Sequence, residues 1–193
     1  ILARLRAAHP RLVVELVLSN EVEDLLRRDA DIAVRMVRPT QAALVARRAG
    51  GIEVGLHAHP AYLAAHGTPR TLAELSAHAI VGFDRETPLV RRVLQAYPML
   101  GRAGLAFRAD SDLAQLAAIR AGLGIGFCQA ALAARDGLVR VLRSRVEVVL
   151  DTWIAMHEDL RDNPRCAVAF AALAEGISAH ARSRAVGRTG KAS

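Results

Sequence analysis

The sequence predicts an α/β fold in which helices pack on a sheet. Segments with strand-like and helix-like patterns alternate along nearly the whole chain, which is typical of α/β proteins. Apolar residues make up 52% of the 193 residues, yet only 4% are aromatic, so Ala, Val, Leu and Ile supply most of the core. No Pro- or Gly-rich linker divides the chain, which argues against two domains in series.

The individual strands and helices follow in order from these patterns. Apolar runs bounded by polar or Gly residues predict strands at residues 12–17, 31–36, 52–58, 79–83, 105–108, 125–128, 138–141 and 152–156. Amphipathic runs with capping residues predict helices at residues 1–8, 19–28, 60–67, 87–96, 111–121 and from 164 onward, with a further helix that Thr71 caps.

Two of these helices carry the clearest local signals. Ser111 can cap the helix over 111–121, and Gly122 offers a left-handed stop. The expected inner stripe of this helix is Leu113, Leu116 and Ala117. Asn163 can cap the last helix, and Pro164 suits its first position. The expected inner face of the last helix is Cys166, Phe170, Leu173, Ala174 and Ile177.

The distribution of charge and the two cysteines indicate which partners and which cellular compartment suit the chain. Of the net charge of +7, four positive charges lie in residues 182–191, which hold no acid; this leaves +3 for the rest of the chain. We expect this tail to be disordered and to give only weak contact with nucleic acid. Cys128 and Cys166 each lie in an apolar run, which predicts small buried side chains rather than a disulfide or redox pair, and fits a reducing cytoplasm.

The Gly-rich segment 122–126 favours a structural role. Its spacing fails for a nucleotide-binding loop, because the third glycine would fall at Phe127 and a helix precedes the segment where a strand should. We expect a helix stop followed by a buried strand.

His57 and His59 lack an evident third metal ligand, so surface or half-buried side chains are expected. No spacing typical of a hydrolase, zinc enzyme or reactive cysteine occurs, so neither catalysis nor a cofactor is expected.

Polar residues gather where predicted strands end. In open α/β sheets, ligands bind outside the carboxyl ends of the strands, where helix N-termini supply N–H donors. Simple capping and turn formation remain the alternative for these residues. They are Ser19, Asn20, Arg35, Arg38, Asp84, Arg85, Ser111 and Asp112.

Five segments resemble, in order, the effector-binding domain of LysR-type transcriptional regulators. They are residues 31–35 (DIAVR), 44–48 (LVARR), 60–69 (PAYLAAHGTP), 121–126 (AGLGIG) and 157–161 (HEDLR), the last followed by the capped helix. The similarity spans about residues 1–180. It departs from the family after the glycine-rich strand, where Cys128 and Gln129 replace the usual Pro.

The resemblance implies two Rossmann-like lobes joined by two crossover strands, the architecture of type 2 periplasmic binding proteins, with a small effector between the lobes. It places lobe I at residues 1–82 and 151–181, lobe II at 83–150 and the basic tail at 182–193, with crossovers near 82–83 and 149–151. The family's winged helix-turn-helix, linker helix and first strand would precede Ile1.

The resemblance also implies a set of effector contacts. Ser111 matches the family's frequent cleft Ser or Thr, and Arg35 could bind a carboxylate through two hydrogen bonds. Asp110 and Asp112 would repel an anion unless arginines offset them, so a zwitterionic or polar effector stays open. The arginines that could do so are Arg35, Arg85 and Arg108. The full set of expected contacts is Ser19, Asn20, Arg35, Met36, Phe83, Asp84, Ser111, Asp112, Gly126 and Phe127.

The implied function is effector sensing by a cytoplasmic, non-enzymatic regulatory domain. Expected partners are a small-molecule effector and further copies of the chain, as a homodimer or higher oligomer, with no membrane contact. DNA would be bound only through the N-terminal domain. The stripe expected at the dimer contact is Ile1, Leu2, Leu5 and Ala8. Two alternatives stay open, a periplasmic solute-binding protein and an enzyme on the same fold, and the first would carry a secretory leader upstream.

Overall fold

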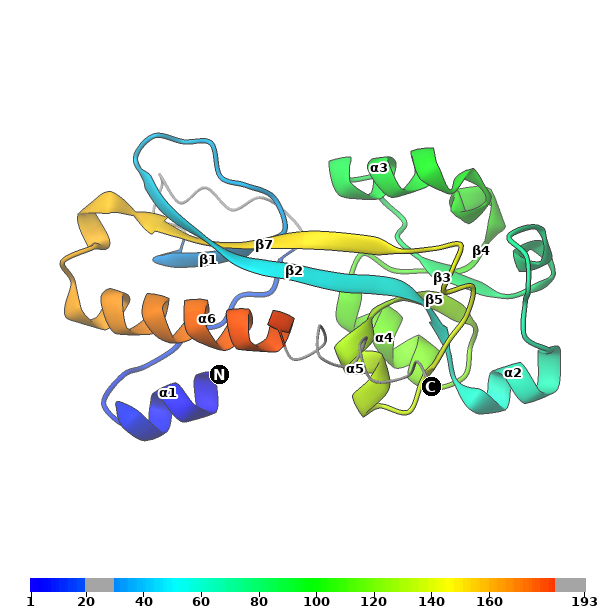
Figure 1. Cartoon of the computed structure of the whole chain (residues 1–193), viewed down its shortest axis with the longest axis horizontal. Helices are drawn as coiled ribbons and strands as arrows, with labels where there is room; N and C mark the ends of the chain where they lie inside the picture. The colour runs from blue at the N-terminus through cyan, green and yellow to red at the C-terminus, as the bar shows by residue number, and fades with distance from the viewer. Residues whose placement is uncertain (20–29, 183–193) are drawn as a thin grey trace, which may run out of the picture. The chain divides into compact units, whose positions relative to one another are not determined.

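A computed structural model describes residues 1–19 and 30–182 of the chain (Figure 1). Its helices are α1 (Leu2–Ala8), α2 (Pro60–His66), α3 (Pro88–Ala96), α4 (Asp112–Arg120), α5 (Ala130–Arg135) and α6 (Pro164–Arg182). Its strands are β1 (Ile32–Arg35), β2 (Leu44–Ala58), β3 (Ile80–Gly82), β4 (Leu105–Arg108), β5 (Ile125–Gln129), β6 (Val139–Arg140) and β7 (Val148–His157). Short 3-10 helices are η2 (Ala73–Ala77), η3 (Pro98–Leu100), η4 (Arg102–Gly104) and η5 (Glu158–Leu160). The alternation confirms the predicted α/β class.

The chain divides into two compact units that β2 and β7 connect. Unit 1 combines the described residues up to Ile52 with those from Leu150 on, and unit 2 contains residues 53–149. The second passage, at residues 149–150, lies where the sequence predicts a crossover. The first lies within β2, at residues 52–53, and not at 82–83 as expected. The reason is that β3 pairs in parallel with both β4 and β5, which places residues 53–82 in unit 2.

In unit 1, α6 covers one face of the pair formed by β1 and β7. The two strands are antiparallel, and Ile154 of β7 packs with Ala174 of α6, both fully buried. Helix α1 lies against α6, where a Cβ on Gly176 would come within 2.5 Å of the Ile1 side chain. Leu5 is buried. The apolar stripe of α1, expected at a dimer contact, is therefore partly used within the chain itself.

The start of α6 forms as the sequence predicts. The Asn163 side-chain oxygen accepts hydrogen bonds from the backbone N–H groups of Arg165 and Cys166, at 3.0 and 3.5 Å. Such a cap satisfies donors that have no partner within the helix. The inner face is also confirmed: Cys166 and Ala174 are buried, and the side chains packed around them are Phe170, Leu173 and Ile177.

The strand expected at residues 12–17 is absent. These residues have no regular secondary structure, and Val13, Leu16 and Val17 are 81%, 65% and 71% exposed. A strand requires a neighbour for its backbone hydrogen bonds, and among the described residues no strand pairs with this segment. The helix expected at 19–28 lies outside the described residues apart from Ser19. The tail beyond Arg182 also lies outside them.

In unit 2, the parallel strands β5, β3 and β4 lie side by side, and the last part of β2 pairs antiparallel with β5. Leu116 and Ile119 of α4 are buried in the core against the sheet. In contrast, Leu113 is 61% exposed and Ala117 is also exposed. The predicted stripe was thus wrong at two of its three positions. Gln115 takes an inward position because its side-chain amide donates to the backbone oxygen of Ala109, at 2.7 Å.

The Gly-rich segment has the structural role that its spacing predicts. Gly122 has a φ of +75° after α4, a left-handed conformation that ends the helix. A Cβ on Gly124 would lie 2.2 Å from the backbone oxygen of Ala79, so only glycine permits this approach.

Two helices differ from the prediction. Helix α5 was not predicted, and Thr71 precedes a 3-10 helix instead of an α-helix. No helix in the described ranges is both long and apolar enough to cross a membrane.

Candidate functional site

Four predicted site residues come together at one edge of unit 2. Strands β3 and β4 are parallel, and the backbone oxygen of Gly82 accepts the N–H of Ala109 at 3.0 Å, just past the end of β4. Phe83 and Asp84 directly follow β3, and Ser111, with Asp112 after it, lies in the segment that follows β4. Because parallel strands end at the same edge, the two loops meet there.

Asp110 ties these two loops together. Its Oδ1 accepts the backbone N–H groups of Asp84 and Arg85, at 3.1 and 2.9 Å, and its Oδ2 lies 3.3 Å from Nε of Arg85. The Asp84 carboxylate pairs with Arg102 at 3.0 Å and with Arg108 at 3.5 Å. Both carboxylates are therefore offset by guanidinium groups. Arg85, one of the arginines that could offset the acids next to Ser111, pairs with Asp110.

Ser111 caps α4 and marks the polar end of that helix. Its Oγ accepts the N–H of Ala114 at 3.3 Å, which confirms the predicted cap. Both Ser111 and Asp112 are exposed, so the first turn of α4 faces solvent. The first turn of a helix presents N–H donors and the positive end of the helix dipole, which attract an acceptor group.

Gly126 and Phe127 lie within β5. Gly126 is buried in register with Val81, and a Cβ there would lie 2.8 Å from the Ile119 side chain, so packing accounts for the glycine. Phe127 is partly buried and packs against the core that includes Leu56. Their contact with an effector stays a prediction.

The unit 1 residues form a second group at the end of β1. Arg35 ends the strand in register with Trp153 of β7, and the sulfur of Met36 accepts the hydroxyl hydrogen of Thr152 at 3.2 Å. The guanidinium carbon of Arg38 lies 5.4 Å from the centre of the Trp153 ring. Sequence reasoning missed Thr152 and Trp153. The usable signal was that the only tryptophan of the chain falls in a predicted strand.

The two remaining predicted contacts lie before β1. Ser19 is exposed at the end of the irregular segment that follows α1. Asn20 lies outside the described residues. The predicted contacts thus fall into a unit 1 group around Arg35 and a unit 2 group around Ser111.

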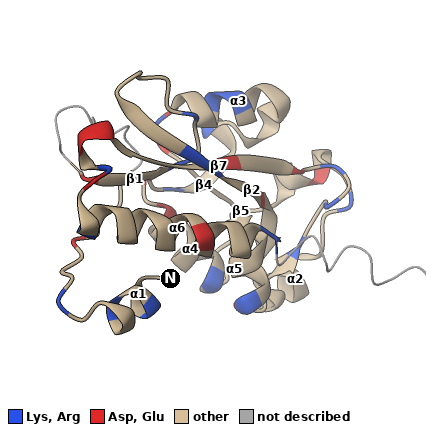
Figure 2. Cartoon of the chain, turned by 60° about the vertical axis from the view of Figure 1, so that its left-hand side comes forward, with Lys and Arg blue, Asp and Glu red and all other residues tan. Residues whose placement is uncertain are grey.

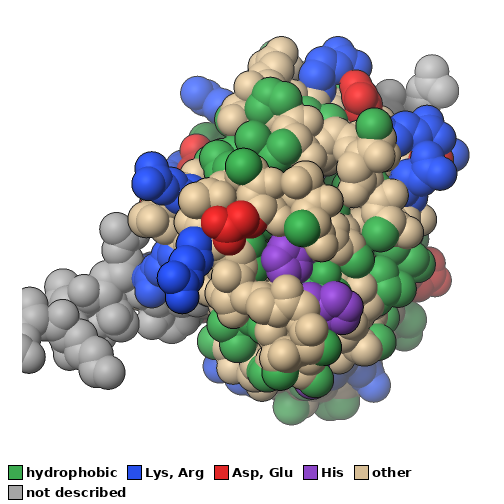
Figure 3. Space-filling view, turned by 90° about the vertical axis from the view of Figure 1, so that its right-hand side faces the viewer, with side chains coloured by type: hydrophobic (Ala, Val, Ile, Leu, Met, Phe, Trp, Pro, Cys, Tyr) green, Lys and Arg blue, Asp and Glu red, His purple; other side chains and the backbone are tan. Residues whose placement is uncertain are grey.

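The histidines near the end of β2 serve local structure. His57 is only 2% exposed, and its Nδ1 lies 2.8 Å from the backbone oxygen of Gly55. It is more deeply buried than expected. Nδ1 of His59 accepts the N–H of Ala61 at 3.2 Å and so caps α2. Figure 3 shows histidine side chains among hydrophobic ones on the face of unit 2 that the view presents. Within the described ranges, no group of three or more His, Cys, Asp or Glu residues could hold a metal ion.

Charged residues of both signs are interspersed along the ribbon in Figure 2. One ion pair is mostly buried: Arg140 of β6 pairs with Glu53 of β2, and their side chains are 14% and 18% exposed. The guanidinium group lies against Gly55, where a Cβ would come within 2.4 Å of it, and donates to the backbone oxygen of Val146 at 3.0 Å. These contacts place the pair in the packing of unit 2.

Both cysteines are buried free thiols, as predicted. Burial raises the pKa of Cys128 to about 11, and the nearby Asp136 carboxylate adds to the effect. Burial also raises the pKa of Cys166. Raised pKa values keep both thiols protonated near neutral pH, which is typical of structural cysteines.

Comparisons of the sequence with protein families and with individual proteins point to the same family. The family described as LysR substrate binding domain matches residues 1–178. The chain is 35% identical over 81 residues to the HTH-type transcriptional regulator CrgA of Neisseria meningitidis serogroup B, covering 42% of this chain and 27% of that protein. It is 32% identical over 78 residues to an HTH-type transcriptional regulator of Xanthomonas campestris, covering 40% of this chain and 23% of the relative. The aligned stretches thus span about a quarter of the length of these relatives.

Solved structures agree with this assignment. The regulatory domain of CrgA from Neisseria meningitidis superposes with a TM-score of 0.76 at 25% identity, covering 91% of this chain and 89% of that one. The effector domain of AmpR from Pseudomonas aeruginosa superposes with a TM-score of 0.69 at 22% identity, covering 95% and 89%, and shows the same fold. The predicted two-lobe class and the resemblance read from the sequence are both confirmed. The chain belongs to the LysR substrate-binding domain family.

Proposed function

We propose that this chain senses a small-molecule effector for a LysR-type transcriptional regulator. The Arg35 group of unit 1 and the Ser111 group of unit 2 each hold candidate effector contacts. Family membership supports the ligand-binding role, and the curated relatives favour a regulator over a solute-binding protein. The resemblance, the partly buried Arg35 at the end of β1 and the exposed first turn of α4 support this choice of residues.

One observation carries the proposal: the exposed first turn of α4 lies beside a charge-balanced loop pair. Asp84 and Asp110 both pair with arginines, so neither presents an uncompensated negative charge to a ligand. The capped helix end then supplies N–H donors to a carboxylate, carbonyl or hydroxyl oxygen. Asp112 remains in the first turn and would favour a ligand that also carries a positive or donor group. A polar or zwitterionic effector fits this arrangement.

The role in the whole protein is part of the same proposal. The relatives are named HTH-type regulators, and the aligned stretches span about a quarter of their length. We propose that a helix-turn-helix elsewhere in the full protein binds the operator, that effector binding here controls it, and that the protein acts in the cytoplasm as a homodimer or higher oligomer. The role is binding without catalysis. A mobility-shift assay of residues 1–193 with operator DNA should then show only salt-sensitive, sequence-independent association.

A thermal-denaturation panel tests effector sensing. The panel contains amino acids, aliphatic carboxylates, aromatic carboxylates, sugars and nucleosides. A ligand that binds only the folded state stabilises it by about 2.7 kcal/mol at a hundredfold excess over its Kd. At least one class should therefore raise the Tm in a saturable way. If every class leaves the Tm unchanged up to millimolar concentrations, the chain is not an effector sensor for these classes and the proposal fails.

A further inference from the structure

We propose that Arg38 and Trp153 of unit 1 form an effector subsite that selects a carboxylate attached to a flat apolar group. This inference rests on the proposed effector-sensing function and adds the chemical class of the ligand. Its starting point is one contact, in which the Arg38 guanidinium carbon lies 5.4 Å from the centre of the Trp153 ring. That separation is within the range of a cation–π interaction.

The strand pairing places a second arginine beside the same ring. Arg35 of β1 is the antiparallel partner of Trp153 in β7. Residues directly opposite one another in antiparallel strands project to the same face of the sheet. Arg38 follows three residues after Arg35, so arginines from β1 and from the segment after it lie next to one indole.

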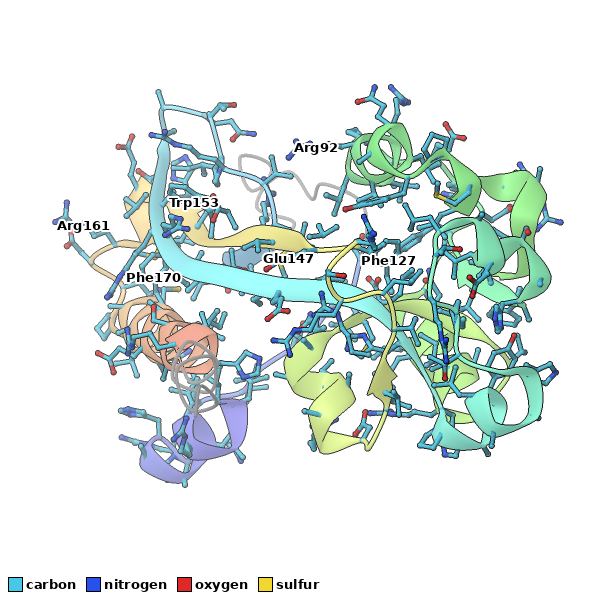
Figure 4. The ribbon with its side chains drawn as sticks, turned by 45° about the vertical axis from the view of Figure 1, so that its right-hand side comes forward. Arg92, Phe127, Glu147, Trp153, Arg161 and Phe170 are labelled. Carbon is cyan, nitrogen blue, oxygen red and sulfur yellow. The ribbon has the colours of Figure 1, made fainter. Side chains whose placement is uncertain are left out.

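This face of the sheet is opposite to the one that α6 covers. Neighbouring residues along a strand alternate between faces, and Ile154, next to Trp153, is fully buried against Ala174 of α6. Figure 4 shows Trp153 and Phe170 of α6 on opposite sides of the β7 ribbon. Trp153 is only partly buried, and the core under α6 does not include it. The packing of α6 therefore does not explain a tryptophan at this position.

The described residues offer no ion-pair partner for the charge of Arg38. The side chain is exposed, and among the residues that the structure describes it has no acidic partner. By contrast, Arg48, which also belongs to unit 1, pairs with Asp151 at 2.6 Å. An arginine that rests on an indole retains N–H donors in a planar arrangement that fits the two oxygens of a carboxylate.

The two side chains select different parts of one ligand. The guanidinium group binds the carboxylate, and the part of the indole that Arg38 does not cover packs on a flat apolar group such as an aromatic ring. Thr152 does not compete for the ligand, because its hydroxyl already donates to the Met36 sulfur. The subsite therefore favours an aromatic carboxylate over a small aliphatic acid or an uncharged aromatic compound.

The direct test is a sodium benzoate titration of the intact chain followed by tryptophan emission. Trp153 is the only tryptophan, so the signal reports on this position alone. Sodium acetate carries the charge without the ring, and benzyl alcohol carries the ring without the charge. Benzoate should change the emission in a saturable way, at concentrations at least about tenfold below those that acetate or benzyl alcohol require. Equal responses to all three compounds would overturn the proposal.

Two variants locate the binding energy. Arg38→Gln should weaken benzoate binding about tenfold, the effect of losing one charge-assisted contact. The matched control is Arg92→Gln, which removes an equally charged, exposed arginine from α3 of unit 2 and should leave the affinity unchanged. Trp153→Leu, measured by calorimetry because the fluorophore is lost, should also bind about tenfold more weakly. Melting curves establish that each variant is folded. Equal weakening in Arg38→Gln and Arg92→Gln would reveal only general charge attraction and would overturn the subsite.

The thermal-denaturation panel separates this inference from the function on which it rests. If a sugar, nucleoside or amino acid raises the Tm while benzoate neither stabilises the chain nor changes its emission, effector sensing stands and the subsite is overturned. If no compound of any class binds, both are overturned. Saturable benzoate binding that depends on Arg38 and not on Arg92 supports both.

Discussion

Arg140 and Glu53 form an ion pair whose two side chains are only 14% and 18% exposed. The pair joins β6 to β2 inside unit 2, and Nε of Arg140 has no hydrogen-bond partner among the described residues. A buried guanidinium group depends strongly on its carboxylate, because removing one partner leaves an uncompensated charge. The pair is therefore expected to matter more for stability than the exposed ion pairs of the chain.

Glu53→Gln should lower the free energy of unfolding by about 2 kcal/mol. This is less than the ~3–5 kcal/mol of a fully buried pair, because both side chains keep some contact with solvent. Asp151→Asn is the matched control, since it breaks the Arg48–Asp151 pair, in which both side chains are 54% exposed, and should cost at most about 1 kcal/mol. Urea denaturation of both variants makes the comparison. Equal losses would contradict the importance of burial.

Ser111→Ala should affect both stability and effector affinity. Loss of the cap should cost about 1 kcal/mol of unfolding free energy. Thr87→Ala is a close control, because the Thr87 side chain accepts the N–H of Val90 at 3.3 Å, the same distance as in the Ser111 cap. Both variants should lose similar stability. Only Ser111→Ala should weaken, about tenfold, the binding of a compound that raises the Tm in the panel. Unchanged affinity in calorimetry would leave Ser111 as a cap alone.

The two thiols should resist alkylation in the folded chain. With a pKa of about 11, Cys128 is only about one part in a thousand thiolate at pH 8, and the thiolate is the reactive form. The pKa of Cys166 is raised in the same direction by burial. Mass spectrometry after iodoacetamide treatment should show little labelling of native protein and labelling of both cysteines in guanidinium chloride. Rapid labelling of the native chain would show that a thiol is accessible and activated.

Acid stability should depend in part on Asp136. Hydrogen bonds, first from Arg120 and then from Arg135, lower the pKa of this carboxyl from its ordinary value of 3.8. A pKa that is lower in the folded chain means that the stabilisation is present above pH 3.8 and is lost as the pH falls through the folded-state value. Asp136→Asn should therefore flatten the decrease in Tm below about pH 4. If the decrease in Tm below about pH 4 is the same in Asp136→Asn, the contact with Arg120 contributes nothing to acid stability.

The elements that the sequence predicts well are those whose signals are local. Asn163 before Pro164, Ser111 before α4 and the apolar run of β4 each fix their element through neighbouring residues, and all three are confirmed. The segment over 12–17 has a strand-like pattern, but a strand also needs a partner, which no local pattern supplies. The first crossover was misplaced for a related reason: nothing local shows that β2 continues unbroken from residue 44 to 58, or that β3 pairs with β4 and β5.

The candidate site divides in the same way. Strand ends and helix caps were enough to place Asp84 after a strand and Ser111 before a helix, and their contact with an effector stays a prediction. Asp110 was expected to repel an anion unless an arginine offset it. Its carboxylate pairs with Arg85 and joins the two loops, a contact between residues 25 or more positions apart. The contact between Arg38 and Trp153 joins segments that are still further apart in the sequence. Such pairings arise from strand register, which cannot be read from either segment alone.

Amide NMR during a titration tests the central claim most directly, using the panel compound that raises the Tm most. We expect the amides of Arg35, Asp84 and Ser111 each to shift in a saturable way, because these residues are the proposed effector contacts. Saturable shifts elsewhere, with these three amides unchanged throughout the titration, would contradict it.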